Sequence, residues 1–247
     1  MRNWALMVAA ATACAQAGSQ AHAAGAAFAV DTAEISDVGN SKVEAWTSWA
    51  NNGKGSAGAP GSADGLATVN PACVIETFSP TEISAQVVRS RGDDEWATSL
   101  TPKAKARLIP TAIGSFGFAA AVGASYDPKA HETTTVFAYI PATLRLSENV
   151  RINLNGGWQL DRTTDRHFAT YGVGLDWRVT DTVILTAETF GQAGTAETAS
   201  ETRPRYQAGV RYRPVDQFNV DVIYGRNING ENADWLTVST TIRFPPK

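Results

Sequence analysis

Long apolar runs are missing from this sequence after its first two dozen residues. A transmembrane helix needs about 20 consecutive, mainly apolar residues. Inside a bilayer only helices and closed barrels satisfy every backbone N–H and C=O group. If the chain crosses a membrane, the sequence therefore requires that it do so as a closed β-barrel.

The sequence also has few cysteines and only a small net charge. Of the two cysteines, Cys14 lies in the N-terminal leader predicted below, so after cleavage only Cys73 remains, and one cysteine offers no disulfide within the chain and no cysteine-based metal site. The formal net charge of −3 excludes the basic footprint of a nucleic-acid-binding protein. A soluble β-protein could have the same composition, so the pattern of residues has to separate a membrane barrel from a soluble one.

The N-terminus has the three parts of a secretory signal peptide. Arg2 provides the positive charge, residues 4–14 form a short apolar core, and Ala21-His22-Ala23 matches an A-x-A cleavage site. We therefore predict a signal peptide over residues 1–23 and a mature chain that begins near Ala24. This predicts export from the cytoplasm.

A lipoprotein leader is the alternative interpretation of the same region. Ala11-Thr12-Ala13 stands directly before Cys14, as a lipoprotein cleavage box would. The leucine expected at the head of such a box is missing, which favours ordinary cleavage after Ala23.

Alternation of apolar and polar residues dominates the rest of the chain. In the C-terminal stretch, Leu236, Val238 and Ile242 fall on one face, and Thr237 and Ser239 fall on the other. Period-two alternation indicates strands, and stretches of roughly ten residues separated by turns are typical of membrane barrels. The predicted strands are 43–49, 72–77, 82–87, 96–108, 116–126, 135–146, 150–161, 166–178, 183–188, 205–212, 218–225 and 235–244.

The connections between these stretches alternate between mostly long and mostly short. This is the pattern of outer-membrane barrels, whose extracellular loops are long and whose periplasmic turns are short. The exceptions are 91–95, which is short for an outer loop, and 109–115, which is long for an inner turn. The glycine-, alanine- and serine-rich segment 50–71 is expected to be a flexible outer loop.

We therefore predict an all-β fold: a transmembrane, antiparallel, up-and-down β-barrel of about 12 strands. Its barrel domain spans residues 42–247, and residues 24–41 form a periplasmic N-terminal segment. Aromatic residues on the proposed lipid face fall near both ends of the strands, as the two interfaces of a bilayer favour. A soluble β-sandwich, the alternative, has no reason to place aromatic residues by depth.

The end of the last strand resembles the assembly signal of bacterial outer-membrane proteins, because its alternating apolar residues end in the aromatic Phe244. Pro245-Pro246-Lys247 follows, so the aromatic is not the final residue. The stretches 141–162 and 203–244 are similar to uncharacterised outer-membrane proteins of alphaproteobacteria. They resemble, more loosely, outer-membrane transporters linked to phenol-degradation pathways. The resemblance implies outer-membrane lipid and the barrel assembly machinery as partners, and no catalytic residues.

Charged residues gather on the face that the alternation turns toward the barrel interior. On the lipid face an arginine or lysine would cost about 2–4 kcal/mol at the bilayer midplane, whereas basic ladders inside a pore favour anions. The proposed pore-lining residues are Lys103, Lys105, Arg107, Arg145, Arg151, Arg178, Arg205, Arg211, Asp221 and Arg243. These charges could instead pair across strands, as Arg211 with Asp221, and fill the interior.

The function predicted from this pattern is passive passage of small solutes across the outer membrane, with anionic or aromatic solutes as candidates. A non-conducting structural, adhesive or ligand-binding barrel is the alternative. An enzyme is not expected, because neither His131-Glu132-Thr133 nor the loop with Asp161, Asp165 and His167 gives a convincing nucleophile–base arrangement. We expect no metal and no cofactor.

Overall fold

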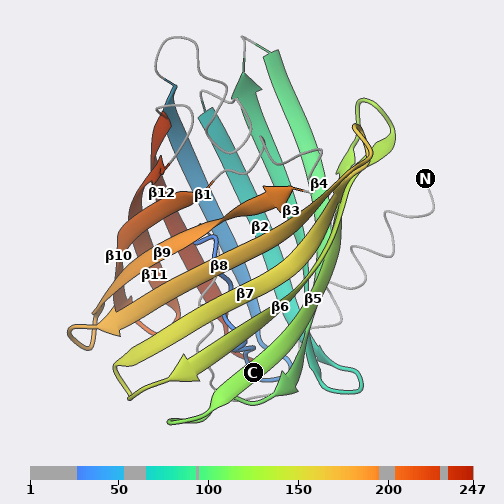
Figure 1. Cartoon of the computed structure of the whole chain (residues 1–247). Helices are drawn as coiled ribbons and strands as arrows, with labels where there is room; N and C mark the ends of the chain where they lie inside the picture. The colour runs from blue at the N-terminus through green and yellow to red at the C-terminus, as the bar shows by residue number, and fades with distance from the viewer. Residues whose placement is uncertain (1–26, 53–64, 93–94, 195–203, 229–232, 247) are drawn as a thin grey trace.

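The computed structural model of the chain describes residues 27–52, 65–92, 95–194, 204–228 and 233–246. Within them the chain forms a closed antiparallel barrel of twelve strands (Figure 1). The strands are β1 Ser41–Asn52, β2 Gly65–Glu76, β3 Pro80–Gly92, β4 Glu95–Ile109, β5 Phe116–Asp127, β6 Glu132–Arg145, β7 Val150–Asp161, β8 Arg166–Arg178, β9 Val183–Gly194, β10 Arg205–Val215, β11 Phe218–Asn227 and β12 Ala233–Phe244.

Each strand pairs with its neighbours in sequence, and β1 pairs with β12 to close the barrel, with Ser41 opposite Phe244. Closure leaves no strand edge unpaired, which a β-structure in lipid requires. The predicted all-β, up-and-down barrel of about twelve strands is confirmed. Among the described residues, no helix is long and apolar enough to cross a membrane.

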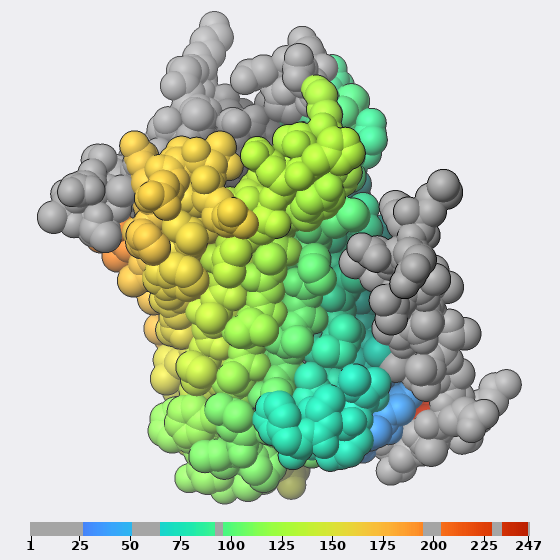
Figure 2. Space-filling view, turned by 90° about the vertical axis from the view of Figure 1, so that its right-hand side faces the viewer, coloured from blue at the N-terminus to red at the C-terminus, as the bar shows by residue number. Residues whose placement is uncertain are grey.

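The alternation in sequence becomes an inside and an outside. On β12, Thr237 and Thr241 are buried on the inner face, whereas Leu236 and Ile242 are exposed on the outer face. On the face that Figure 2 presents, side chains of neighbouring strands pack into a continuous wall. Exposed aromatic residues occur near both ends of the strands: Trp49, Trp96, Trp158, Tyr206 and Tyr224 near one, and Phe116, Trp177, Tyr212 and Phe244 near the other. A soluble monomer rarely exposes so large an apolar surface, so this wall is suited to lipid.

The two ends of the barrel are named by the connections that they contain. We call the end with connections 128–131 and 162–165 the loop end, and the end with 146–149 and 179–182 the turn end. The long inner connection before β5 folds back on the barrel, because Gly114 donates its N–H to the carbonyl of Arg145, 2.8 Å away. The length of this connection therefore allows it to reach the end of β6 and bind there.

The prediction was wrong in part at the segment 50–71. β1 continues to Asn52 and β2 begins at Gly65, so both ends of the expected loop belong to strands. Small residues and Pro71 gave β2 weak alternation, but its pairing with β1 on one side and β3 on the other supplies the hydrogen bonds. The middle of the expected loop lies outside the described residues.

Candidate functional site

Residues 27–40, which precede β1, lie inside the barrel, where Figure 1 shows them as a blue trace between the strands. At the turn end, Gly39 donates its N–H to the carbonyl of Val74, and Val74 donates its own to the carbonyl of Asn40. From there the segment reaches Ala29, whose N–H is bound by Glu188 on β9. We call residues 28–38 the plug segment.

This placement corrects the expectation of a periplasmic segment over residues 24–41. The part of it that the structure describes contacts inward-facing side chains instead. The physical reason is complementarity: the segment carries carboxylates and free backbone amides, and the wall around it carries cations and hydrogen-bonding side chains.

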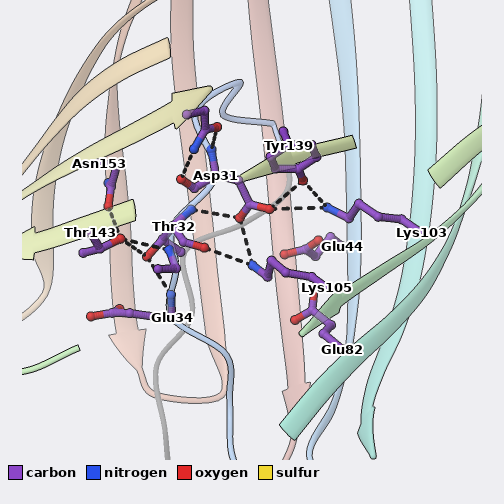
Figure 3. Close-up of polar contacts among 12 residues, drawn as sticks. Asp31, Thr32, Glu34, Glu44, Glu82, Lys103, Lys105, Tyr139, Thr143 and Asn153 are labelled. Carbon is purple, nitrogen blue, oxygen red and sulfur yellow. Dashed lines mark hydrogen bonds and ion pairs between the residues drawn. The ribbon is translucent and has the colours of Figure 1, made fainter. Parts of the chain in front are cut away.

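Asp31 is the polar centre of the plug segment (Figure 3). Its carboxylate lies 2.9 Å from Nζ of Lys105 and 3.5 Å from Nζ of Lys103, and it accepts a 2.8 Å hydrogen bond from the hydroxyl of Tyr139. Burial raises the pKa of Asp31, but the two ammonium groups and the hydrogen bonds lower it more, so its pKa lies below the ordinary 3.8. Asp31 is therefore an anion at any physiological pH.

Side chains of the wall bind the backbone of the plug segment. Asn155 accepts the N–H of Asp31 at 2.7 Å and donates to its carbonyl at 2.8 Å, and Thr143 accepts the N–H of Ala33 at 2.9 Å. Lys105 also donates to the carbonyl of Thr32. An extended segment inside a barrel has no strand partner, and these side chains satisfy its backbone groups instead.

Glu34 ties the plug segment to the wall nearer the turn end. Its carboxylate accepts hydrogen bonds from Arg145 at 2.8 Å and from Arg151 at 2.6 Å. Arg151 also donates to Asp176, 2.7 Å away on the neighbouring strand β8. The acidic segment therefore extends a charge network that the wall already contains.

Apolar contacts complete the docking. A Cβ placed on Gly172 of β8 would lie 2.8 Å from a methyl group of Val30, and one on Gly174 would lie 3.4 Å from its Cβ. Two glycines on the inner face of β8 therefore leave the space that Val30 occupies. Deeper toward the turn end lies an apolar cluster formed by Ala33, Ile35, Val38, Val74 and Ala119.

Other charges of the interior are paired within the wall. Arg211 donates to Asp221 at 2.6 and 3.1 Å, and Asp221, which is completely buried, also accepts a hydrogen bond from Ser239. On β1, Lys42 lies 3.1 Å from Glu44 of the same strand and 3.1 Å from Glu82 of β3. The rival interpretation of the sequence, cross-strand pairing, is therefore correct for Arg211 and Asp221.

Open space remains above and below the plug segment. Two cavities of about 320 and 280 Å³ lie toward the loop end, and both are lined by Ala29, Phe190 and Arg205. A cavity of about 50 Å³ lies at the turn end among arginines. Between them, Thr32, Ala33, Glu34 and Ile35 of the plug segment are buried, so the described lumen is narrowed at mid-height by the chain itself.

The residues predicted to line a pore take inward positions, but they do not form one uninterrupted basic ladder. Lys103 and Lys105 bind Asp31, and Arg145 and Arg151 bind Glu34. The others are distributed between the wall and the cavities: Arg211 pairs with Asp221, Arg205 borders the loop-end cavities, Arg178 and Arg243 border the turn-end cavity, and Arg107 shares the alternating face of Lys105. Their role in solute passage stays a prediction.

Sequence reasoning missed the two residues that matter most to this interior, Asp31 and Glu34. A signal was present: three carboxylates, Asp31, Glu34 and Asp37, lie between the predicted leader and the first strand, and the predicted inner face has an excess of cations. Matching these two sets would have favoured a segment inside the barrel.

The histidines considered as catalytic candidates lie in loop-end hairpins. His167 accepts a hydrogen bond from the indole N–H of Trp158 at 3.1 Å, and His131 lies 3.5 Å from the hydroxyl of Tyr126. These are contacts between aromatic rings on the exterior of the barrel. The absence of catalysis, metal and cofactor stays a prediction.

Solved structures with the same fold are outer-membrane channels. The KdgM porin in complex with disordered oligogalacturonate superposes with a TM-score of 0.62 at 8% identity, over 82% of this chain and 99% of that one. The NanC porin gives 0.61 at 4% identity, over 81% and 98%. The COG4313 outer membrane channel from Pseudomonas putida F1 gives 0.52 at 14% identity, over 83% and 95%. These likenesses show the fold; they do not address alphaproteobacterial origin or phenol degradation.

No curated protein matches this sequence. One family does, and its match extends from residue 12 to residue 244, through the plug segment and all twelve strands. The chain belongs to the family described as uncharacterised conserved protein UCP029691.

Proposed function

We propose that this protein is an outer-membrane channel for passive passage of small solutes, and that its plug segment sets how often the lumen is open. The observation that carries the proposal is a polar, charged inner face with cavities at both ends of a narrow, chain-filled middle. A barrel whose interior served only as a packed core would not require cavities large enough for water at both ends. The fold shared with porins and channels supports this interpretation.

The plug segment is suited to leave its site, because most of its contacts are side-chain contacts rather than a strand ladder. Its bonds to Asn155, Thr143, Lys105 and Arg151 can be exchanged for water in a hydrated lumen. The barrel itself does not depend on the segment, since β1 closes against β12 from Ser41 onward. Passage is therefore proposed to follow undocking of residues 28–38.

Planar-bilayer recording of the mature protein tests this proposal. Gly172→Val places two methyl groups where Val30 now lies and is expected to raise the open fraction. Gly156→Val is the matched control, because a Cβ at that exposed glycine meets nothing within 4 Å. The proposal fails if the Gly172 and Gly156 variants conduct alike, or if neither conducts in correctly folded protein.

The finer proposal, a preference for anions, concerns the state with the plug segment displaced. Lys103 and Lys105 lose Asp31 in that state, so with Arg107 they would present three cations along one strand. Each raises the local concentration of passing anions over a Debye length of about 10 Å at 0.1 M salt. Replacing all three with glutamine in the Gly172→Val background should remove the anion preference in a salt-gradient reversal potential. An unchanged reversal potential would count against the ladder. Aromatic solutes remain a second candidate class.

A non-conducting barrel is the competing function, and the dense pairing between the plug segment and the wall favours it. In that case the segment is permanent packing that helps a small barrel fill its interior. Ligand-binding or adhesion would then lie in the loop-end cavities and hairpins. Silence of every variant in the bilayer, with normal folding, would establish this alternative.

Location and assembly complete the proposal. We infer export by a signal peptide over residues 1–23, which lie outside the described residues, insertion into the outer membrane of a Gram-negative bacterium, and recognition of the strand ending at Phe244 by the assembly machinery. N-terminal sequencing of protein from the membrane fraction should begin near Ala24. A lipid-modified Cys14 would contradict this cleavage site.

A further inference from the structure

Arginines gather at the turn end of the barrel because of how the strands run. Alternate strands of an antiparallel barrel end at the same edge. Each of β6, β8, β10 and β12 has an inward arginine within its last three residues: Arg145, Arg178, Arg213 and Arg243. With Arg151 and Arg211 they line the cavity of about 50 Å³, beside the turn Ser147, Glu148 and Asn149.

The plug segment already shows what this wall binds. Glu34 places a carboxylate against Arg145 and Arg151 with oxygen–nitrogen distances of 2.8 and 2.6 Å. Planar guanidinium groups suit oxyanions, because their N–H donors match the spacing of carboxylate and phosphate oxygens. The edge of this cavity is thus a working oxyanion site that an internal side chain occupies.

Arg178 differs from its neighbours. Arg151 binds Asp176 and Arg211 binds Asp221, so both face carboxylates of the wall. Among the described residues, the guanidinium of Arg178 makes no ion pair or hydrogen bond, although the side chain is half-buried and borders the cavity. No carboxylate of the described residues therefore neutralises the positive charge of Arg178.

We propose that this cavity binds a small free oxyanion, a phosphate or a carboxylate, with Arg178 as the principal ligand and Arg145 and Arg213 beside it. A water molecule needs roughly 10–15 Å³ of such volume, so about 50 Å³ accommodates an ion of a few heavy atoms and excludes a large solute. The site opens toward the turn end, which would face the periplasm, and its inward position keeps lipid head groups away.

The competing explanation is structural. Acidic residues follow three of these arginines in the turns, and Asp216 lies 4.0 Å from Arg213. Glu148 and Asp181, three residues after Arg145 and Arg178, are exposed. In that explanation the arginines only steady the turns and general attraction concentrates anions, without a saturable site. The two explanations differ in whether the loss of Arg178 weakens anion binding more than the loss of an arginine outside the cavity.

Isothermal titration of the purified mature barrel in detergent with inorganic phosphate, at constant ionic strength in chloride, tests the proposal. Saturable binding is expected, and Arg178→Gln should weaken it roughly tenfold or more, because a hydrogen bond to a charged group is lost. Arg107→Gln is the matched control: it removes the same charge near the end of β4, outside the cavity, and should change the affinity less than about twofold.

Heat-modifiable mobility in SDS gels establishes that each variant is folded, and Arg213→Gln replaces Arg178→Gln if that variant does not fold. No saturable binding by the wild type would overturn the proposal. Equal weakening by the Arg178 and Arg107 variants would also overturn it, in favour of general attraction. The binding assay does not use conductance, so this inference can fail while the channel proposal stands, and the reverse.

Discussion

Asp31→Asn should release the plug segment from the wall without opening the barrel. The change keeps the shape of the side chain but removes the charge that lies 2.9 Å from Lys105 and accepts the hydroxyl of Tyr139. Only 1% of the Lys105 side chain is exposed, so water cannot easily replace the lost partner. A hydrogen bond to a charged group contributes about 1.5–3 kcal/mol. Because asparagine retains one acceptor oxygen, we expect a loss of about 3 kcal/mol in docking free energy for the two contacts together.

Such a loss corresponds to a rise of about a hundredfold in the undocked population, since 1.4 kcal/mol is a factor of ten. Hydrogen exchange measures it directly, because the N–H groups of Ala29, Asp31 and Ala33 are bound only by wall side chains in the docked state. Protection of peptides covering residues 29–34 should fall by about that factor while the strand amides keep theirs.

Glu44→Gln is the matched control for this experiment. It also removes one buried carboxylate charge from the interior, but Glu44 binds Lys42 and Asn70 of the wall and, within the described part of the chain, makes no hydrogen bond or ion pair with the plug segment. Its peptides over residues 29–34 should exchange as in the wild type. The reasoning is refuted if Asp31→Asn leaves that protection unchanged, or if strands and plug segment lose protection together.

Three further predictions concern the pH dependence of docking, an ion pair within the wall and the lipid-facing surface. The lowered pKa of Asp31 means that its contribution to docking is present above the unfolded value of 3.8 and is lost only as the pH falls through the still lower docked value. Hydrogen exchange of the N–H groups of Asp31 and Ala33, which are bound by the uncharged Asn155 and Thr143, should therefore be the same at about pH 7 and pH 5 after correction for the intrinsic pH dependence. Asp221→Asn should destabilise the barrel by about 3–5 kcal/mol in urea unfolding, because it removes the buried carboxylate charge that accepts two hydrogen bonds from Arg211, and the double variant with Arg211→Gln should lose less than the sum of the two single losses. Val173→Arg on the exposed face of β8 should cost about 2–4 kcal/mol in unfolding from lipid vesicles, and a cost near zero would contradict the lipid-facing assignment.

The fold could be predicted because a barrel wall repeats one local rule. Each strand alternates between lipid and interior, and each turn returns the chain to its neighbour. Where the rule is followed, as in 150–161, the predicted strand has the observed bounds. Where small residues and a proline weaken the alternation, as in 65–71, the strand was missed, because its pairing on both sides supplies what its own pattern does not.

The candidate site was predicted less completely. The inward side of the basic residues followed from the alternation, since a cation on the outer face would meet lipid. Their partners did not follow, because ion pairing depends on which residues a closed barrel brings to the same height. Lys105 and Asp31 are 74 residues apart in sequence, and Arg151 and Glu34 are 117 apart.

The sequence alone thus determined the class of fold and the side of the wall on which each strand residue lies, because both depend on neighbours within one strand. Tertiary structure alone decided where the segment before β1 goes. Asp31 and Glu34 favour cationic surroundings, but residues 28–38 by themselves do not specify which side chains supply the cations or where these lie. The segment can bind inside the lumen only after β4, β6, β7 and β8 have formed the wall around it. These strands bring together the residues that contact it, which are Lys105, Tyr139, Asn155 and Gly172.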